Sequence, residues 1–415
     1  MPIVRGDFTP GAVLPEIGFA TASFTGPDGV TWPLTNPPGG WFTLADGVSG
    51  VGAAPVELTT DDHPRGGSRL RHVQPVSRTV VWPLHVYGDD HLQFTARWRA
   101  LARAFTGTLR RRPDGTYPPG VLEIARPDGT RRRIECFYRE GFEGQGARGT
   151  GINSDTAILS LYCEDPYFYD PQPMAERREF ATGEDFLQPY PSVSSGQVLG
   201  ATVLVNPGDV IAWPSWTITG PASLVTFTHD DSGDSFVLDP ADVSGSLLAH
   251  EQVIITTDPP KVTKYTTERQ TIDLGGATAG TVTITFDGQT TGSIAYNADA
   301  ATVQAALEAL SNLDAEDVFV TGGPLPGTIT LTFAGQYLGV NVPEVTVTPT
   351  GLTGGTVTVA TVTEGATANW VGALNWPGAV LWPLEPGPNA VTFQLDGSGP
   401  GSAVEVQFFP RFETA

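Results

Sequence analysis

The stretch Leu161–Pro171, LYCEDPYFYDP, divides this chain of 415 residues into two unlike parts. Up to Cys163, apolar and polar residues alternate as they do in a β-strand with one buried face. Two prolines then bracket three aromatic residues, Tyr167, Phe168 and Tyr169. Because proline cannot donate a hydrogen bond within a sheet, the strand is predicted to end here. We expect the three aromatic residues to pack at a domain junction rather than to bind a ligand.

The charge on the two sides of this stretch differs strongly. Residues 1–150 contain 17 Arg, no Lys and 15 Asp plus Glu, for a net charge of +2, whereas residues 151–415 contain 6 basic and 30 acidic residues, for a net charge of −24. Such an asymmetry indicates parts with different roles. A surface this acidic repels nucleic acid and anionic lipid. We therefore expect no specific nucleic-acid binding and no membrane association.

The composition predicts a mainly β protein. The chain has 49 Gly and 36 Pro, and short apolar alternations are separated by turn residues. It has no run of 18 apolar residues, and its first residues lack the apolar core of a signal peptide, so we expect synthesis and folding in the cytoplasm. Cys136 and Cys163 each lie within an alternating segment and are expected to be buried and reduced, without a metal or redox role.

Residues 1 to about 88 have the pattern of turns and short strands, with a break at 64–67 (PRGG) and a clear strand at 79–87. Asp89 and Asp90 then offer an N-cap for a helix at 91–105. Four apolar side chains follow at spacings of four, three and four, which places them on one face of that helix. They are Phe94, Trp98, Leu101 and Phe105. We expect this face to pack against a sheet.

Two arginine triplets each lie beside a PDGT turn. They are Arg110, Arg111 and Arg112, and Arg131, Arg132 and Arg133. The second triplet follows a hairpin turn at 126–129, where Pro and Gly stand in the positions that a type I or II turn requires. Most charge runs are solvated, and a pair of exposed hairpin tips is the simpler interpretation. The alternative is a basic rim that contacts phosphate or an acidic neighbouring subunit.

Beyond residue 175, two tryptophan-rich segments, 206–220 and 369–383, are separated by more than a hundred residues without tryptophan. The simplest account is one β-sandwich interrupted by an insert at roughly 269–364. The insert has no Lys or Arg after Arg269, and it repeats GTVTITFDGQ (280–289) as GTITLTFAGQ (327–336). Between the repeats, Asn297 or Asp299 can cap a helix at 300–312. The insert is thus predicted to be strands packed on one helix.

No motif for catalysis or metal binding is present. The six His residues do not form HExxH or another metal-ligand spacing, and GxSxG, P-loop and GxGxxG-helix patterns are absent. Segment 229–234, HDDSGD, resembles part of a calcium loop but lacks the later glutamate, and a polar hairpin turn explains it more simply. Asp314, Glu316 and Asp317 are expected to form a solvated acidic loop. We predict no enzyme activity, no catalytic residue, no metal and no cofactor.

Four segments together resemble the distal tail protein (Dit) family of long-tailed, siphovirus-type bacteriophages. They are LYCEDPYFYDP (161–171), NPGDVIAWPSWTITGPA (206–222), LWPLEPGPNAVTFQL (381–395) and VEVQFFPRF (404–412). The resemblance covers residues 1 to about 265 and 366–415 and rests on the order of these patterns. The insert, with GQTTGSIAYNADAATVQAALEALSN (288–312), is similar to a small module of structural proteins from phages that infect actinobacteria.

The resemblance implies a structural protein of the virion, located at the tail tip or baseplate and assembled in the host cytoplasm. Its copies would form a hexameric ring joining the tail tube protein to the tail-tip hub and other minor tail proteins. The implied domains are a ring-forming domain of strands and one amphipathic helix (1–175), a galectin-like β-sandwich (176–268 and 366–415), and an inserted α+β module (269–365). The alternative is a carbohydrate-binding adhesin that contacts host cell-wall glycan through the sandwich or the insert.

Overall fold

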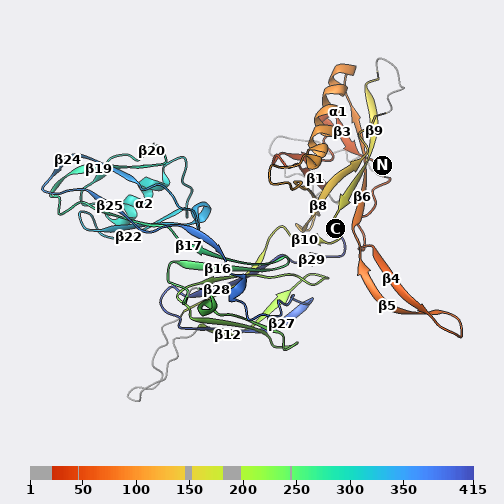
Figure 1. Cartoon of the computed structure of the whole chain (residues 1–415). Coiled ribbons are helices and arrows are strands. Elements are labelled where there is room, and N and C mark those ends of the chain that lie inside the picture. Colours follow the sequence, from red (N-terminus) through yellow and green to blue (C-terminus); the bar gives the residue numbers. More distant parts are fainter. Residues whose placement is uncertain (1–20, 45, 145–151, 181–197, 244) are drawn as a thin grey trace.

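The computed structural model describes residues 21–44, 46–144, 152–180, 198–243 and 245–415, and the fold is mainly β, as predicted. Three hydrophobic cores lie along an elongated molecule (Figure 1). The first core is built mostly from residues before Leu161–Pro171, the second lies in a β-sandwich, and the third lies in the insert at the far end.

The first core lies against a nine-stranded antiparallel sheet. Along the main path, its strands are β2 (Thr31–Pro33), β1 (Thr21–Thr25), β7 (Gly120–Ala125), β8 (Arg131–Glu140), β9 (Ser154–Cys163), β6 (Arg78–Tyr87) and β3 (Trp41–Thr43). β10 (Phe168–Tyr169) pairs with β8 and with β29 (Arg411–Phe412). Short 3-10 turns, η1 (Pro37–Gly39) and η2 (Gly107–Leu109), precede β3 and follow the helix.

The helix α1 (His91–Thr106) confirms the predicted helix and its cap. The Asp90 side chain accepts a hydrogen bond from the backbone N–H of Gln93 at 2.7 Å, which satisfies a donor that the first turn leaves free. Of the predicted stripe, Phe94, Leu101 and Phe105 are buried in the first core, and Trp98 packs at its edge. The spacing of these apolar residues therefore fixes which face of α1 covers the sheet.

The strand predicted to end within Leu161–Pro171 is β9, and it ends at Cys163, before the first proline. It pairs with β6 along its whole length, from Ser154 opposite Tyr87 to Cys163 opposite Arg78. Leu161 and Cys163 are fully buried, and both cysteines are free thiols.

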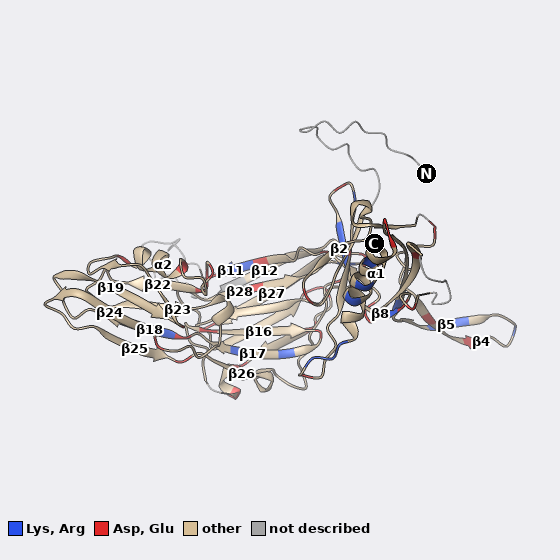
Figure 2. Cartoon of the chain, turned by 90° about the horizontal axis from the view of Figure 1, so that it is seen from above, with Lys and Arg blue, Asp and Glu red and all other residues tan. Residues whose placement is uncertain are grey.

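Residues 411–415 return to the first core after the sandwich is complete. Phe412 pairs with Phe168 through β29 and β10, and the Ala415 N–H donates to the Val51 carbonyl at 3.0 Å. Ala415 is a buried member of the first core, and Phe412 packs against it. The C label accordingly lies beside this body in Figures 1 and 2. The first core is thus made from segments at two distant places in the sequence.

The sandwich consists of two sheets around a core rich in aromatic residues. One sheet contains β11 (Met174–Glu179), β28 (Ala403–Phe408), β13 (Ser215–Thr219), β16 (Glu251–Thr257), β17 (Pro260–Thr266) and β26 (Ala366–Asn369); the other contains β12 (Val198–Asn206), β27 (Gly387–Asp396), β14 (Leu224–His229) and β15 (Ser235–Leu238). Turns η3 (Pro240–Asp242) and η5 (Val371–Ala373) contact one another. The rings of Trp216 and Trp382, from opposite sides of the insert in sequence, meet edge to face with centroids 5.3 Å apart.

The insert has two four-stranded sheets and one helix. The sheets are β22 (Val318–Gly322), β23 (Ile329–Phe333), β18 (Arg269–Asp273) and β25 (Thr358–Thr363), and β20 (Gln289–Thr290), β19 (Ala279–Phe286), β21 (Ile294–Ala295) and β24 (Thr346–Thr353). A turn, η4 (Gly335–Tyr337), follows β23. The repeated sequences form β19 and β23 in different sheets. Their matching residues Phe286 and Phe333 stack with centroids 5.1 Å apart, so the repeat packs against itself.

The insert helix α2 (Ala300–Glu308) is shorter than the predicted 300–312. Asp299 is its cap, accepting a hydrogen bond from the Thr302 N–H at 2.8 Å. The chain then tightens, because the Leu310 N–H bonds to the Leu307 carbonyl three residues back. The Asn312 side chain donates to the Phe286 carbonyl at 3.1 Å. Bonding to a strand therefore replaces the last predicted helical turn.

Candidate interaction surfaces

The first core with its nine-stranded sheet and α1 is called the first body below. A two-stranded arm projects from it (Figure 1). It consists of β4 (Val56–Asp62) and β5 (Ser68–Pro75), which pair only with each other among the described strands. Every residue of both strands is exposed. Two-stranded hairpins without further packing are marginally stable in water. The arm therefore lacks the support that the rest of the fold receives.

The two faces of the arm differ in polarity. Val56 pairs with Pro75, Leu58 with Val73 and Thr60 with Leu70, which gives one mainly apolar face. The intervening pairs are polar: Glu57 with Gln74, Thr59 with His72 and Asp61 with Arg69. The apolar side chains are 44–56% exposed. An amphipathic ribbon of this kind has one face suited to burial, and this chain does not cover it within its described residues.

Sequence reasoning missed this arm and found only turns and short strands around the break at 64–67. The available signal was the run VELTTDD before the break and SRLRHVQP after it, each with apolar residues interspersed among polar ones. A β-bulge between Thr59 and Thr60 shifts the register, which disguises the alternation in the second strand.

The aromatic residues of Leu161–Pro171 lie between the first core and the sandwich. Phe168 is fully buried, and the guanidinium carbon of Arg78 lies 4.9 Å from its ring centroid. Tyr169 meets Phe409 edge to face at 6.1 Å, and Arg411 lies over the Tyr167 ring at 4.8 Å. Phe168 therefore packs inward, while the two tyrosines face groups from the end of the sandwich.

The triplet Arg131–Arg133 makes ion pairs within the chain. Glu123 accepts from Arg133 at 2.6 Å and lies 3.5 Å from Arg131. Arg132 lies 3.5 Å from Asp170 and also covers the Phe412 ring, with its guanidinium carbon 3.5 Å from the centroid. Arg132 thus reaches the domain junction, whereas Arg131 and Arg133 pair with Glu123 of β7, a difference that their position in the sequence did not reveal.

The triplet Arg110–Arg112 is exposed at the other PDGT turn. Arg111 donates to the Gly115 carbonyl at 3.0 Å, and within the described part of the chain none of the three has a carboxylate within 4 Å. The two triplets therefore differ: Arg131–Arg133 form ion pairs within the chain, whereas Arg110–Arg112 are exposed and have no such pair among the described residues.

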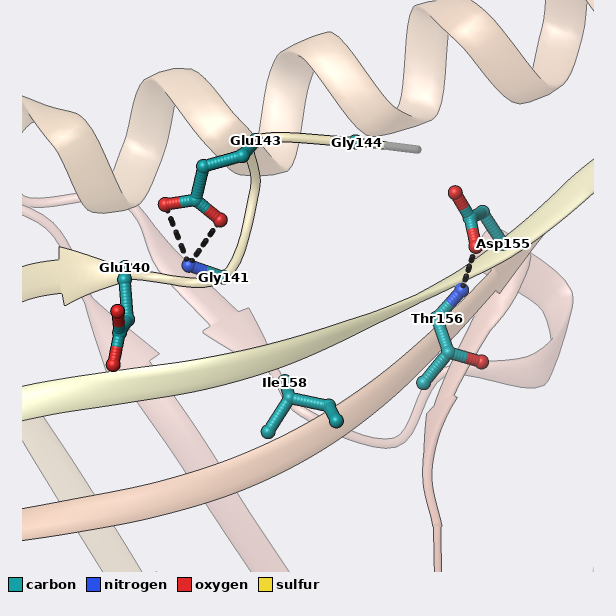
Figure 3. Close-up of a pocket in the computed structure, with 7 residues that line it drawn as sticks. All are labelled: Glu140, Gly141, Glu143, Gly144, Asp155, Thr156 and Ile158. Atoms are coloured by element: carbon teal, nitrogen blue, oxygen red, sulfur yellow. Dashed lines mark hydrogen bonds between the residues drawn. The ribbon is translucent and has the colours of Figure 1, made fainter. Parts of the chain in front are cut away.

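A surface hollow of about 320 Å³ beside β9 contains three carboxylates, Glu140, Glu143 and Asp155 (Figure 3). Both oxygens of Glu143 accept from the Gly141 N–H, and Asp155 accepts from the N–H of Thr156. Figure 3 shows Glu143 and Asp155 well apart rather than converging. The local backbone therefore accounts for the position of these two acidic groups.

The predicted polar turn at 229–234 joins β14 to β15, and the Gly233 N–H donates to the His229 carbonyl at 2.8 Å. Asp230 accepts from the Thr392 hydroxyl at 2.9 Å, and Asp231 accepts from the Ala390 N–H at 3.1 Å. These carboxylates bond to β27. Across the described residues, no group of three or more His, Cys, Asp or Glu is arranged to hold a metal ion.

The expectation of a solvated loop at Asp314–Asp317 is wrong for Asp317, which is 4% exposed. Its carboxylate accepts hydrogen bonds from the Asp314 N–H at 2.8 Å and the Gln336 N–H at 3.0 Å. Burial opposes its charge, but bonds from Gln336 and Asp314 outweigh that effect and lower the pKa of Asp317. The carboxylate fastens the loop after α2 to η4.

Among the described residues, no helix is long and apolar enough to cross a lipid bilayer.

No protein-family model and no curated protein matches this chain. Among solved structures, it is similar to the Dit protein of phage SPP1, which is described as a paradigm of the hub adsorption apparatus in phages that infect Gram-positive bacteria. The two sequences are 12% identical, the match covers 95% of this chain and 99% of that chain, and the TM-score is 0.46. A structure of infectious bursal disease virus, Gx strain, gives 11% identity, coverage of 95% and 79%, and a TM-score of 0.10. At these values, neither likeness assigns a function.

Proposed function

We propose that this chain is a structural subunit of the tail tip of a long-tailed bacteriophage, whose copies form a six-membered ring between the tail tube and the tail-tip hub. The observation that carries the proposal is the arm β4–β5, whose apolar face is left uncovered by the described residues of its own chain. The sequence resemblance to the Dit family of phage tails points the same way.

A second copy of the chain is better placed to cover the apolar face of the arm than the body that carries the arm. The arm projects away from α1 and the sandwich in Figure 1, so the described residues of its own chain leave its apolar face free for another molecule. Each copy carries the same arm and the same receiving surface. Contacts of this head-to-tail type close into a ring when the rotation between neighbours is a whole fraction of a turn.

The proposal includes a division of labour along the chain. Residues 1–175 would form the ring, residues 176–268 and 366–415 would form a galectin-like sandwich outside it, and the module 269–365 would extend further. The tube protein, the hub and other minor tail proteins would be its partners in the virion. No enzymatic step is part of this role.

Replacing Leu58 with aspartate tests the arm. Burying a leucine contributes about 1.5–3 kcal/mol, and a buried unpaired charge adds a further cost, so Leu58→Asp should weaken self-association at least about tenfold. Thr59→Asp is the matched control, because it adds the same charge on the polar face, opposite His72. Sedimentation and negative-stain microscopy measure the ring. Equal assembly of both variants, or a native chain that stays monomeric, would argue against the proposal.

The alternative, an adhesin that binds host cell-wall glycan, draws on two exposed aromatic residues. Trp376 in the sandwich is 51% exposed and Phe319 in the insert is 43% exposed, and such rings can stack on sugars. The other sandwich tryptophans of the second Trp-rich segment, Trp370 and Trp382, are buried in the core. Removing the insert takes away Phe319 and leaves Trp376 in place, which separates the two candidates.

The insert can be removed cleanly because its ends are adjacent. β17 pairs with β26, with Thr266 opposite Ala366, so replacing residues 267–365 by Asn-Gly leaves a hairpin with a favoured two-residue turn. We expect ring assembly to be unchanged in this variant. Rings that form normally but no longer adsorb to host cells would assign the receptor contact to the insert. Loss of assembly would contradict the proposed division of labour.

A further inference from the structure

A cleft of about 520 Å³ opens between the first body and the sandwich, beside Leu161–Pro171. Four aromatic residues line it, together with three carboxylates and one guanidinium. These residues are Tyr167, Tyr169, Trp213 and Phe409, then Glu135, Asp165 and Asp258, and Arg411. Aromatic faces beside carboxylates are the surroundings in which organic cations bind best.

Two guanidinium groups at this junction already use that chemistry. Arg411 donates to Asp165 at 2.6 Å and lies over the Tyr167 ring at 4.8 Å. Arg132 lies 3.5 Å from Asp170 and 3.5 Å from the centroid of the Phe412 ring. In each case one carboxylate and one aromatic face hold one arginine.

The remaining groups of the cleft are two carboxylates and two aromatic rings, which resemble these two sites but hold no arginine. Glu135 and Asp258 have no hydrogen bond or ion pair through their carboxylates within the described residues, and both line the cleft with Trp213 and Phe409. Phe409 is 44% exposed. Partial burial of the carboxyl, and then the charges of Asp165 and Glu164, raise the pKa of Glu135. The carboxylates that line the cleft outnumber its one guanidinium. A cation from outside the chain would offset this imbalance.

We propose that this cleft receives the guanidinium of Arg65 at the tip of the arm of a second copy. This inference rests on the proposed ring and adds where the arm ends. The strands of the arm span roughly 25 Å at about 3.3 Å per residue, enough to reach from one body into a recessed cleft on another. Arg65 has no carboxylate within 4 Å among the described residues.

The shape of the tip suits a narrow cleft. Gly66 and Gly67 follow Arg65 with φ of 91° and 84°, and the space around both is open. These left-handed conformations favour glycine, so the turn stays tight and the two residues after Arg65 add no side chain to the tip. The triplet Arg110–Arg112 is a second source of arginine, but it lies on the body itself and is less suited to a recess.

Cross-linking between copies tests the contact directly. Arg65→Cys combined with Asp258→Cys should give a ladder of covalent oligomers with a short bismaleimide cross-linker, visible on denaturing gels; the linker spans the length that the arginine side chain no longer supplies. The native thiols should stay silent, because both are buried and burial raises the pKa of Cys163 to about 12. Each single variant is a control. Arg112→Cys with Asp258→Cys tests the triplet as the source, and cross-linking by this pair alone would overturn the proposal.

A charge exchange provides the second measurement. Asp258→Arg and Arg65→Asp should each weaken self-association roughly tenfold, since a hydrogen bond between charged groups is lost and like charges meet. The double variant should recover most of that loss. If the native chain forms rings while the cysteine pair gives no ladder and the exchange shows no recovery, the cleft is not the docking site, although the ring stands. If the native chain forms no ring, the proposed function itself fails.

Discussion

Arg78→Met is expected to lower the free energy of unfolding of the first body by about 3–5 kcal/mol. Arg78 is 1% exposed and donates hydrogen bonds to the carbonyls of Gly50 at 2.9 Å, Gly52 at 2.6 Å and Glu413 at 2.8 Å. Methionine fills similar space but leaves three carbonyls without this donor. Hydrogen bonds from a charged donor contribute about 1.5–3 kcal/mol each and are not additive.

Burying the charged guanidinium of Arg78 costs free energy, and its hydrogen-bond partners must offset that cost. Burial lowers the pKa of Arg78, while nearby acidic groups act in the opposite direction, and no carboxylate lies within 4 Å of it in the described chain. Backbone carbonyls and the Phe168 ring therefore supply its surroundings. Removing the guanidinium affects three segments at once, those that contain Gly50 and Gly52, Phe168 and Glu413, which is why the expected effect is large.

Chemical denaturation measures this change, and hydrogen exchange locates it at β10 and β29. Arg99→Met is the matched control, because Arg99 is exposed on α1 and forms no ion pair among the described residues. We expect less than about 0.5 kcal/mol from the control. If Arg78→Met unfolds at the same denaturant concentration as the native chain, Arg78 does not hold the junction together.

Trp216→Ala is expected to destabilise the sandwich by about 3–5 kcal/mol, the range for removing a large aromatic side chain from a core. Trp216 is fully buried and contacts Phe227 at 4.6 Å and Trp382 at 5.3 Å between ring centroids. Its loss leaves a cavity at the meeting point of segments from both sides of the insert. Thermal and denaturant unfolding, followed by the remaining tryptophan fluorescence, measure the effect.

Two further variants separate cavity formation from other causes. Trp376→Ala removes the same side chain at a 51% exposed position and should cost much less. Trp216→Phe should also be milder than alanine, because the Trp216 indole N–H has no hydrogen-bond partner among the described residues. Equal losses for Trp216→Ala and Trp376→Ala would show that packing in the sandwich core is not the reason.

Local patterns predicted much of the architecture. α1 followed from Asp90 and a stripe at spacings of four, three and four, because those apolar side chains have to share one buried face. The repeated sequence at 280–289 and 327–336 predicted two similar strands, and Phe286 and Phe333 of these strands stack on each other. These features depend on neighbours in sequence, which periodicity records.

Features that depend on distant partners escaped prediction. Asp317 appears as one of several acids in a loop, and only its bonds to Gln336 reveal a buried role. Arg132 belongs to an arginine run, and its stacking on Phe412 joins positions that no local pattern links. The acidic and aromatic cleft is assembled from five separate parts of the chain. Its charge balance was therefore invisible before those parts were brought together.

The return of residues 411–415 to the first core also determines how late in synthesis that core can be completed. Arg78 and its acceptor Glu413 are separated by 335 positions, which a ribosome covers in roughly 20–70 s at about 5–20 residues per second. During that interval the first body has its arm and its helix but lacks β29. The first core is therefore complete only after the sandwich and the insert have been synthesised.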